Sequence, residues 1–305
     1  MKLVSYTRDG ATRHGYVADE AAGTVAELGD GDLAALVAAG AGTAADWRPP
    51  APSGTHRLAD LTVRAPIARP TKVLAVAANY QDHVAEGGGA PLDKSTLAPR
   101  LFLKPGTSVA DPGADIALPA ISTQVDWEAE LVVVVGRGGR DIPVERALDH
   151  VAGYTAGNDV SARSVDYGYQ RDTSSPAVGY FDWLAGKWPD GFAPYGPYLV
   201  TADEVPDPQD LGIELEVNGT LRQKGSTAAM IFTVAELVAF ASRLMTLEPT
   251  DIIMTGTPAG VGAASGTYLA AGDEMTVRIA GLGALTNRVV HPTAGPVPAE
   301  QIPER

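Results

Sequence analysis

The chain has 305 residues, a formal net charge of −14 and no cysteine, and its hydrophobic content of 45% is typical of a water-soluble globular protein. Its length allows one large domain with an appendage, or two domains. The negative charge argues against binding to nucleic acid or to an anionic membrane, and the lack of cysteine excludes disulfides and cysteine nucleophiles. Neither a signal peptide nor a membrane-spanning run is apparent, so we expect a cytoplasmic enzyme or binding protein.

Residues 1–62 are predicted to form a small N-terminal α/β domain. Its expected elements are strands at 3–6 and 15–17, a helix at 32–40 and a proline-rich linker at 49–54. The helix is indicated by Asp32 before an apolar stretch and by Gly40 after it. No catalytic residue is indicated in this part of the chain.

A strand is expected at 72–77, followed by a short helix within 79–86 and a flexible triple glycine at 87–89. On such a helix His83 and Glu86 are three positions apart, so their side chains share a face and can touch. The glycines beyond them would let the segment move as a lid. The alternative is a surface histidine beside an ordinary helical glutamate.

The segment 125–136 combines acidic residues with an apolar, β-branched run that predicts a buried strand. Because side chains alternate along a strand, Glu128 and Glu130 point the same way, with Asp126 behind them. Neighbouring carboxylates at a buried strand need protons, basic groups or a metal ion to neutralise them, and carboxylate ligands suit Mg²⁺ or Mn²⁺. The alternative is a solvated strand end with a surface acidic pair.

A second strand is predicted to end at Asn158-Asp159, where a helix could begin. Asp159 is then either the N-cap of that helix or a third carboxylate aimed at the acidic pair. The polar and aromatic segment 164–186 is expected to form a loop over the site.

The last third of the chain is predicted to be mostly strands. The expected elements are a hairpin of 213–217 and 221–224 around Asn218-Gly219, a helix at 234–247, and strands at 251–254, 274–279 and 285–290. The loop 255–262 offers hydroxyls and backbone N–H groups at a strand end, where ligands are often held, but it is not a P-loop.

Several ordered motifs together carry more information than any one of them. They are Asn79-Tyr80-x-x-His83-x-x-Glu86, Asp126-Trp127-Glu128-Ala129-Glu130-Leu131, Gly157-Asn158-Asp159-Val160-Ser161-Ala162-Arg163, Gly186-Lys187, Phe192-Ala193-Pro194-x-Gly196-Pro197, Val217-Asn218-Gly219 and Thr255-Gly256-Thr257-Pro258-Ala259-Gly260-Val261-Gly262. This series resembles the fumarylacetoacetate hydrolase family, especially its acylpyruvate and diketo-acid hydrolases, across a catalytic domain at 66–290. The resemblance implies a mainly β (α+β) fold, a mixed β-sandwich roll with short helices, usually paired into a homodimer. Residues 291–305 are expected to be a loose C-terminal tail.

The same resemblance implies roles for individual residues. The metal ligands would be Glu128, Glu130 and Asp159, holding Mg²⁺ or Mn²⁺, with Ca²⁺ possible in crystals. The catalytic residues would be His83, Glu86 and Lys187. The substrate-binding residues would be Arg163, Thr257, Gly256 and Tyr80.

The implied activity is a divalent-metal-dependent hydrolase that cleaves a C–C bond of a β-diketo acid through a metal-bound enolate. His83, oriented by Glu86, would activate the attacking water, and Lys187 would add a positive charge nearby. The partner is therefore a small oxo acid. Two alternatives stay open: a decarboxylase, hydratase or isomerase of a 2-oxo acid on the same scaffold, and a non-catalytic binding protein.

The sequence departs from the acylpyruvate-cleaving members in one region. Where these often have a glutamine shortly after the arginine, this chain has Asp166 close by, and the segment before Lys187 is longer than usual. Arg171, Asp172 and Tyr180 are the candidate specificity residues within it.

Overall fold

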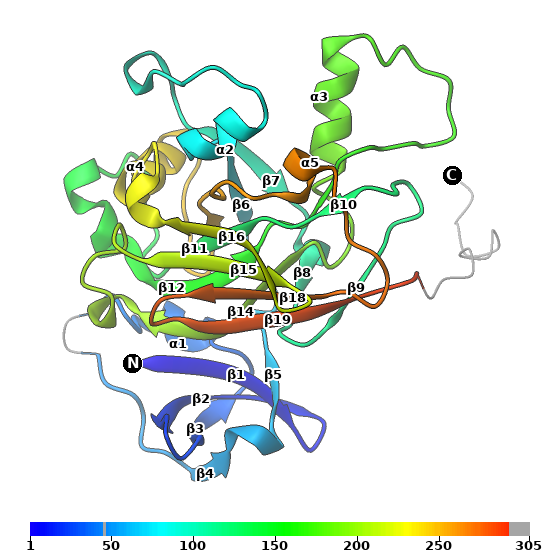
Figure 1. Cartoon of the computed structure of the whole chain (residues 1–305). Helices are drawn as coiled ribbons and strands as arrows, with labels where there is room; N and C mark the ends of the chain where they lie inside the picture. Colours follow the sequence, from blue (N-terminus) through cyan, green and yellow to red (C-terminus); the bar gives the residue numbers. More distant parts are fainter. Residues whose placement is uncertain (45–46, 293–305) are drawn as a thin grey trace, which may run out of the picture.

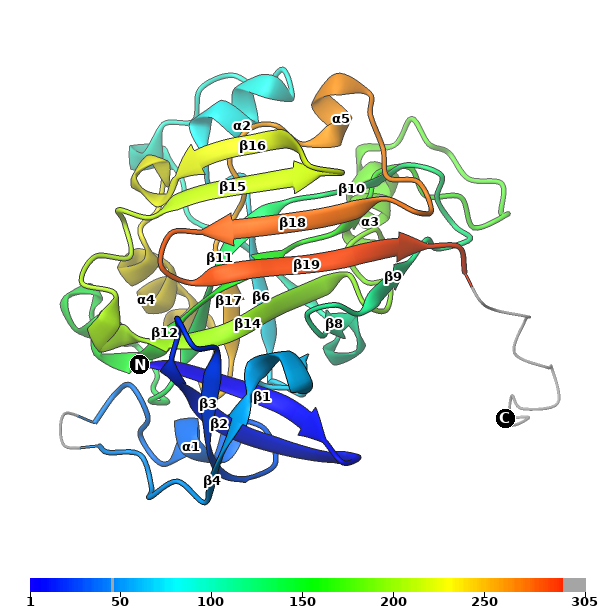
Figure 2. The same cartoon turned by 60° about the horizontal axis from the view of Figure 1, so that its bottom comes forward.

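The computed structural model describes residues 1–44 and 47–292, and its body consists of two β-sheets that pack face to face (Figures 1 and 2). Across the described residues the larger sheet has twelve strands. Ten form one path, in the order β4 (Gly54–Arg57), β3 (Thr24–Asp30), β2 (Ala11–Asp19), β1 (Lys2–Arg8), β14 (Ala193–Thr201), β12 (Val151–Asn158), β11 (Ala129–Val135), β17 (Ile252–Met254), β6 (Val73–Ala77) and β7 (Arg100–Lys104). Two more lie off this path: β5 (Thr62–Arg64) pairs with β1, and β8 (Val109–Ala110) pairs with β14.

The second sheet lies in front of the first in Figure 2. Its order is β16 (Thr220–Ser226), β15 (Gly212–Val217), β18 (Glu274–Ile279), β19 (Gly283–Val290) and β9 (Asp115–Ala117), and a separate pair joins β10 (Val125–Asp126) to β13 (Ser161–Ala162). The α-helices are α1 (Ala34–Ala38), α2 (Gln81–Glu86), α3 (Pro176–Ala185), α4 (Val234–Leu244) and α5 (Gly262–Ser265). Short 3₁₀ helices lie at Leu58–Asp60, Lys94–Thr96, Gly106–Ser108, Val144–His150, Ala202–Glu204 and Thr227–Ala229. The predicted mainly β fold with short helices is confirmed.

Strand β11 separates two hydrophobic cores, and every one of its residues is buried. Leu131 and Val133 point into the core shared with the second sheet, whereas Val132 and Val134 point into a second core on the other side. Because side chains alternate along a strand, Glu130 shares the side of Val132 and Val134. The acidic end of this strand therefore faces the second core.

The N-terminal strands continue the main sheet instead of forming a detached sheet. Lys2 and Leu3 of β1 pair antiparallel with Val200 and Leu199 of β14. The apolar face of α1 then closes the second core from below, where Leu36 and Val37 are buried. In Figure 1 these strands lie at the bottom, whereas α2, α3 and α5 lie together at the top.

The structure differs from the sequence predictions at two places near the site. The segment 164–186, predicted as a loop, contains the ten-residue helix α3, which begins with Pro176 at its first turn. Asp159 caps no helix, because the chain after it continues into strand β13.

Other predicted elements are found close to where they were expected, including the hairpin of β15 and β16 and helix α4. The predicted loose tail at 291–305 lies outside the described residues from 293 onward. Among the helices that the structure does describe, none combines the length and the apolar character needed to cross a membrane.

Candidate active site

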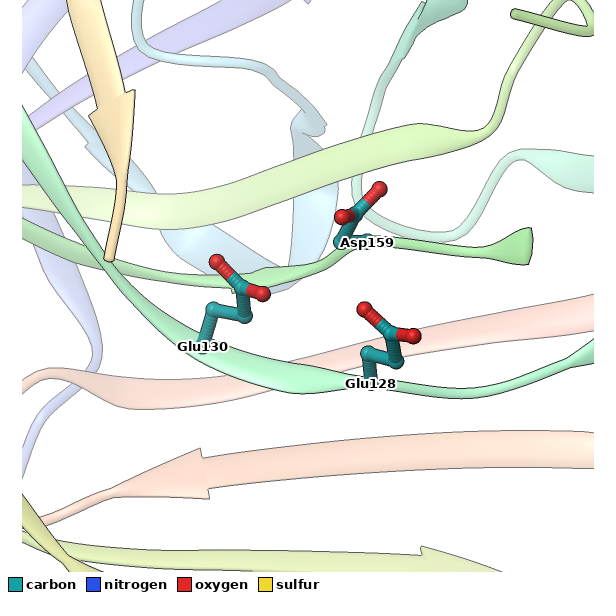
Figure 3. Close-up of side chains that lie close together, drawn as sticks. All are labelled: Glu128, Glu130 and Asp159. Atoms are coloured by element: carbon teal, nitrogen blue, oxygen red, sulfur yellow. The ribbon is translucent and has the colours of Figure 1, made fainter. Parts of the chain in front are cut away.

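Three buried carboxylates converge where strand β11 begins and strand β12 ends. Glu130 lies in β11 and Glu128 just before it, while Asp159 directly follows β12. The antiparallel pairing places Ala129 opposite Asn158, and the Asp159 N–H donates to the Glu128 carbonyl at 2.9 Å. One carboxylate oxygen from each of the three lies within 4.8 Å of the others. Figure 3 shows the three side chains pointing to the same side of the sheet.

Two buried lysines hold this acidic cluster, which we define as Glu128, Glu130 and Asp159. The Lys187 ammonium donates to Glu128 at 2.8 Å and to Asp159 at 2.7 Å. On the other side of Asp159, the Lys104 ammonium donates to its second carboxylate oxygen and to the Val160 carbonyl. Asp159 is therefore fixed between two cations.

Burial and charge move the pKa values of these groups in different directions. Burial, together with the charges of Asp159 and Glu128, raises the pKa of Glu130 well above its usual range. Burial also acts to raise the pKa of Glu128, but Lys187 and Arg163 outweigh it and keep that pKa below its usual range. For Lys104, burial prevails over the attraction of Asp159 and lowers the pKa of the ammonium. Burial thus disfavours the charged forms of Glu130 and Lys104, whereas two nearby cations favour the charged form of Glu128.

Arg163 is bound to the protein instead of pointing freely into the site. Its guanidinium donates to Asp126 at 2.9 Å and to Glu128 at 2.6 Å. Asp126 in turn accepts hydrogen bonds from the N–H groups of Gly262 and Ala263, at the start of α5. Asp126 therefore anchors the arginine and the start of α5, and it is not a fourth member of the acidic cluster.

The predicted contact between His83 and Glu86 is formed on α2. His83 Nδ1 lies 2.7 Å from one Glu86 oxygen, and the other Glu86 oxygen accepts the Gly260 N–H at 2.7 Å. The Gly260 carbonyl accepts a hydrogen bond from the Trp127 indole at 3.0 Å. The histidine is therefore connected through Gly260 to the segment that bears Glu128.

The loop after β17 fixes the backbone of the acidic cluster. Gly256 has φ of +96°, which favours glycine, and its N–H donates to Glu130 at 2.8 Å. The Thr257 hydroxyl donates to the Ala129 carbonyl at 2.9 Å and accepts from Gln223 at 2.8 Å. Gln223 also accepts the Ala129 N–H at 2.9 Å. The peptide between the two glutamates is thus held on both edges by side chains.

A cavity of about 160 Å³ brings most of the predicted site residues together. Its lining includes His83, the two glutamates of the cluster, Arg163, Lys187 and Thr257, with Phe102 and Trp183 as aromatic walls. Tyr80 does not line this cavity. It is fully buried at the start of α2, and its hydroxyl has no hydrogen-bond partner among the described residues.

Sequence reasoning missed three residues that hold the acidic cluster, namely Lys104, Gln223 and Asn158. Asn158 accepts the Glu128 N–H at 2.8 Å. Lys104 lies two residues after Phe102 in a predicted strand, so the two side chains share a face. A lysine on the same face as a buried aromatic residue was the available signal that Lys104 is buried. Gln223 follows an exposed arginine in a hairpin, and nothing in the local sequence sets it apart.

Comparison with known proteins identifies the family. Residues 72–290 match the sequence model of the fumarylacetoacetate (FAA) hydrolase C-terminal domain. A mitochondrial oxaloacetate tautomerase of Xenopus laevis is 42% identical over 233 residues, which are 76% of this chain and 69% of the relative.

Two solved structures are similar over 96% of this chain and 100% of their own. One is a fumarylacetoacetate hydrolase from Exiguobacterium antarcticum, 35% identical with a TM-score of 0.78. The other is a 2-hydroxyhepta-2,4-diene-1,7-dioate isomerase from Mycobacterium marinum, 33% identical with a TM-score of 0.76. With its buried acidic cluster at the position where the sequence motifs converge, this chain belongs to the fumarylacetoacetate hydrolase family of enzymes.

Proposed function

We propose that this protein catalyses a divalent-metal-dependent proton transfer next to the ketone of a small 2-oxo acid, interconverting its keto and enol forms. The observation that carries the proposal is that His83, which Glu86 binds, lines one small cavity together with Glu128 and Glu130 of the acidic cluster. The relatives named as an oxaloacetate tautomerase and a heptadiene-dioate isomerase support this class of reaction.

The acidic cluster fits a hard divalent cation. The cluster and Asp126 together supply four carboxylates, whereas three cations, Lys104, Arg163 and Lys187, bond to them, so there is one carboxylate more than there are cations. Burial is the main cause of the raised pKa of Glu130, and the charges of Asp159 and Glu128 add to it. Oxygen ligands of this kind suit Mg²⁺ or Mn²⁺. When bound, such a cation would polarise adjacent carbonyl and carboxylate oxygens of the substrate as a Lewis acid.

His83 is the group that would move the proton. Because Glu86 binds Nδ1, the neutral imidazole has its proton on that nitrogen and its acceptor lone pair on Nε2. We assign Nε2 to proton removal from, and return to, the carbon beside the ketone. Lys187, which lines the same cavity, offers a positive charge where negative charge develops on the substrate.

Hydrolysis of a C–C bond in a β-diketo acid is the second candidate. The same dyad would then take a proton from water instead of from carbon, and the structural relative named as a fumarylacetoacetate hydrolase favours this reaction. A decarboxylation would need neither role for His83. Assembly into a homodimer stays a prediction, which light scattering of the purified protein tests.

Two assays and one variant separate these candidates. The purified protein is incubated with oxaloacetate and with an acylpyruvate, each with Mg²⁺, Mn²⁺ or a chelator, and enol loss and C–C cleavage are followed separately. We expect metal-dependent conversion of the enol, and a loss of roughly 10²–10⁴-fold in rate for His83→Ala with Mg²⁺ binding retained. The control is His150→Ala, just before β12 at the end opposite Asp159, where the partly exposed imidazole lies 2.8 Å from the Arg137 carbonyl.

The outcomes are distinct. Cleavage of the acylpyruvate without tautomerisation would replace the first candidate by the second. Full activity of His83→Ala with either substrate would exclude the dyad as the acid–base group.

A further inference from the structure

A larger cavity of about 490 Å³, which we call the outer cavity, neighbours the inner cavity that holds Glu128 and Glu130. It shares Ala78, His83 and Arg163 with the inner cavity, so the two cavities are neighbours that meet at these residues. The outer cavity is also lined by Glu86, Arg100 and the glycines that follow α2. A substrate held at the acidic cluster would therefore extend its far end past His83 into this space.

Arg100 lies on the strand that leads from the acidic cluster to this outer cavity. In β7 the side chains of Arg100, Phe102 and Lys104 are two residues apart, so they share one face of the strand. Lys104 bonds Asp159, Phe102 lines the inner cavity, and Arg100 lines the outer one. Four residues of strand span about 13 Å between the Cα atoms of Arg100 and Lys104. The side chain of Arg100 therefore starts within the length of a short carbon chain from Lys104, which bonds the cluster.

The charges of the outer cavity favour an anion. Arg163 is already bound by Asp126 and Glu128, and Glu86 by His83 and the Gly260 N–H. Within the part of the chain that the structure describes, no ion pair or hydrogen bond is found for the Arg100 guanidinium. Its five N–H donors are therefore available to a ligand, in the fork geometry that matches a carboxylate.

We propose that Arg100 binds the distal carboxylate of a dicarboxylic 2-oxo acid, and so selects dicarboxylates over monocarboxylates of the same length. This inference rests on the proposed function for the position of the oxo-acid end, and it adds the chemistry of the other end. Arg100 also borders an apolar cavity lined by Phe102, Tyr180 and Trp183, which offers a competing place for an uncharged tail.

Matched pairs of ligands test this selectivity. 2-Oxoadipate and 2-oxohexanoate have the same chain length and differ only in a terminal carboxylate or methyl group. Their binding to the full-length protein with Mg²⁺ is measured by calorimetry, and exchange of the hydrogens beside the ketone with deuterium is followed by NMR. 2-Oxoglutarate and 2-oxopentanoate form a second pair one carbon shorter.

We expect wild type to bind the dicarboxylate at least about tenfold more tightly in one of these pairs, and Arg100→Met to lose that difference. In the exchange reaction, the variant should raise KM for the dicarboxylate and leave kcat for the monocarboxylate unchanged. Arg288→Met, which replaces an exposed arginine of β19, is the control and should keep the wild-type preference.

The result that overturns the inference is a dicarboxylate preference that survives in Arg100→Met, or wild-type protein without any preference, which would place the far end in the apolar cavity. Calorimetry detects binding without turnover, so it judges Arg100 even where no hydrogen exchange occurs. Absence of exchange in wild type, with binding intact, would instead contradict the proposed reaction.

Discussion

At the scale of single residues, the site contains buried carboxylates that each bond more than one cation. Asp159 is held by Lys104 and Lys187, and Glu128 by Lys187 and Arg163. Such networks contribute little net stability, but removing one member leaves another charge buried without its partner. Mutation of a cation in this network should therefore change the stability of the fold and the affinity for a metal ion in different directions.

Lys104→Met tests this separation. The substitution keeps the aliphatic volume but removes a buried cation from Asp159, so the metal-free protein should lose roughly 3–5 kcal/mol of unfolding free energy. Removing a positive charge also strengthens the attraction of the cluster for a cation. The rise in Tm on adding Mg²⁺ should therefore be larger in the variant than in wild type, as measured by thermal unfolding with and without the metal.

Lys94→Met provides the control, because Lys94 forms an exposed ion pair with Glu236. Its effect on stability should stay within about 1 kcal/mol, and its response to Mg²⁺ should equal that of wild type. An equal Mg²⁺ response in Lys104→Met and wild type would show that Lys104 does not oppose the cation.

At the scale of elements, the local sequence predicted the features that depend on side-chain alternation along a strand or on a turn motif. The face shared by Glu128 and Glu130 followed from strand periodicity, and the hairpin followed from Asn218-Gly219. Helix α3 was missed because its residues are mostly apolar and aromatic, include a glycine and show weak periodicity. Its position depends on a tertiary contact, the edge-to-face packing of Trp183 on Phe102 at 5.0 Å, which the local sequence does not reveal.

A second buried acid lies in the N-terminal strands, far from the proposed site. Glu27 of β3 accepts hydrogen bonds from Tyr6 and Arg8 of β1, both at 3.0 Å, and from Ser53. Burial opposes ionisation, but the Tyr6 hydroxyl and the Arg8 charge outweigh it and lower the pKa of Glu27 below its usual value of 4.5. The carboxylate therefore connects strands β1 and β3 in its charged form.

Replacing this acid should make the stability of the protein less dependent on pH. Because the pKa is lowered in the folded state, the stabilisation is complete above the unfolded value of 4.5 and is lost as pH falls through the folded pKa. Glu27→Gln should cost about 2 kcal/mol at pH 7 and progressively less below pH about 4.5, in urea unfolding followed by circular dichroism. A cost that grows in acid would contradict this assignment.

At the scale of the whole molecule, the N-terminal strands and the catalytic body share one sheet and one core. Leu3 and Leu33 pack in the same core as Tyr195 and Leu199 of β14. The division into domains at 1–62 and 66–290 stays a prediction, since sequence composition marks a change of pattern but cannot show which strands pair across it. β5, which pairs with β1, begins at that boundary.

Removal of residues 1–62 should therefore leave the remainder without a cooperative unfolding transition, because β14 would lose its partner β1 and the second core its cover. The measurement is calorimetry of the fragment beside the full chain. A milder variant, Leu3→Ala, should remain folded and lose about 2–5 kcal/mol. A fragment that melts cooperatively near the full-length Tm would show that the catalytic body folds by itself.

The bond between Gly260 and Glu86 has a consequence for how two parts of the molecule depend on each other. The same carboxylate that binds the His83 imidazole also ties α2 to the loop after β17, and that loop donates the Gly256 N–H to Glu130. A displacement of the loop would therefore change the hydrogen bonding of a member of the acidic cluster and of the carboxylate that orients the histidine at the same time.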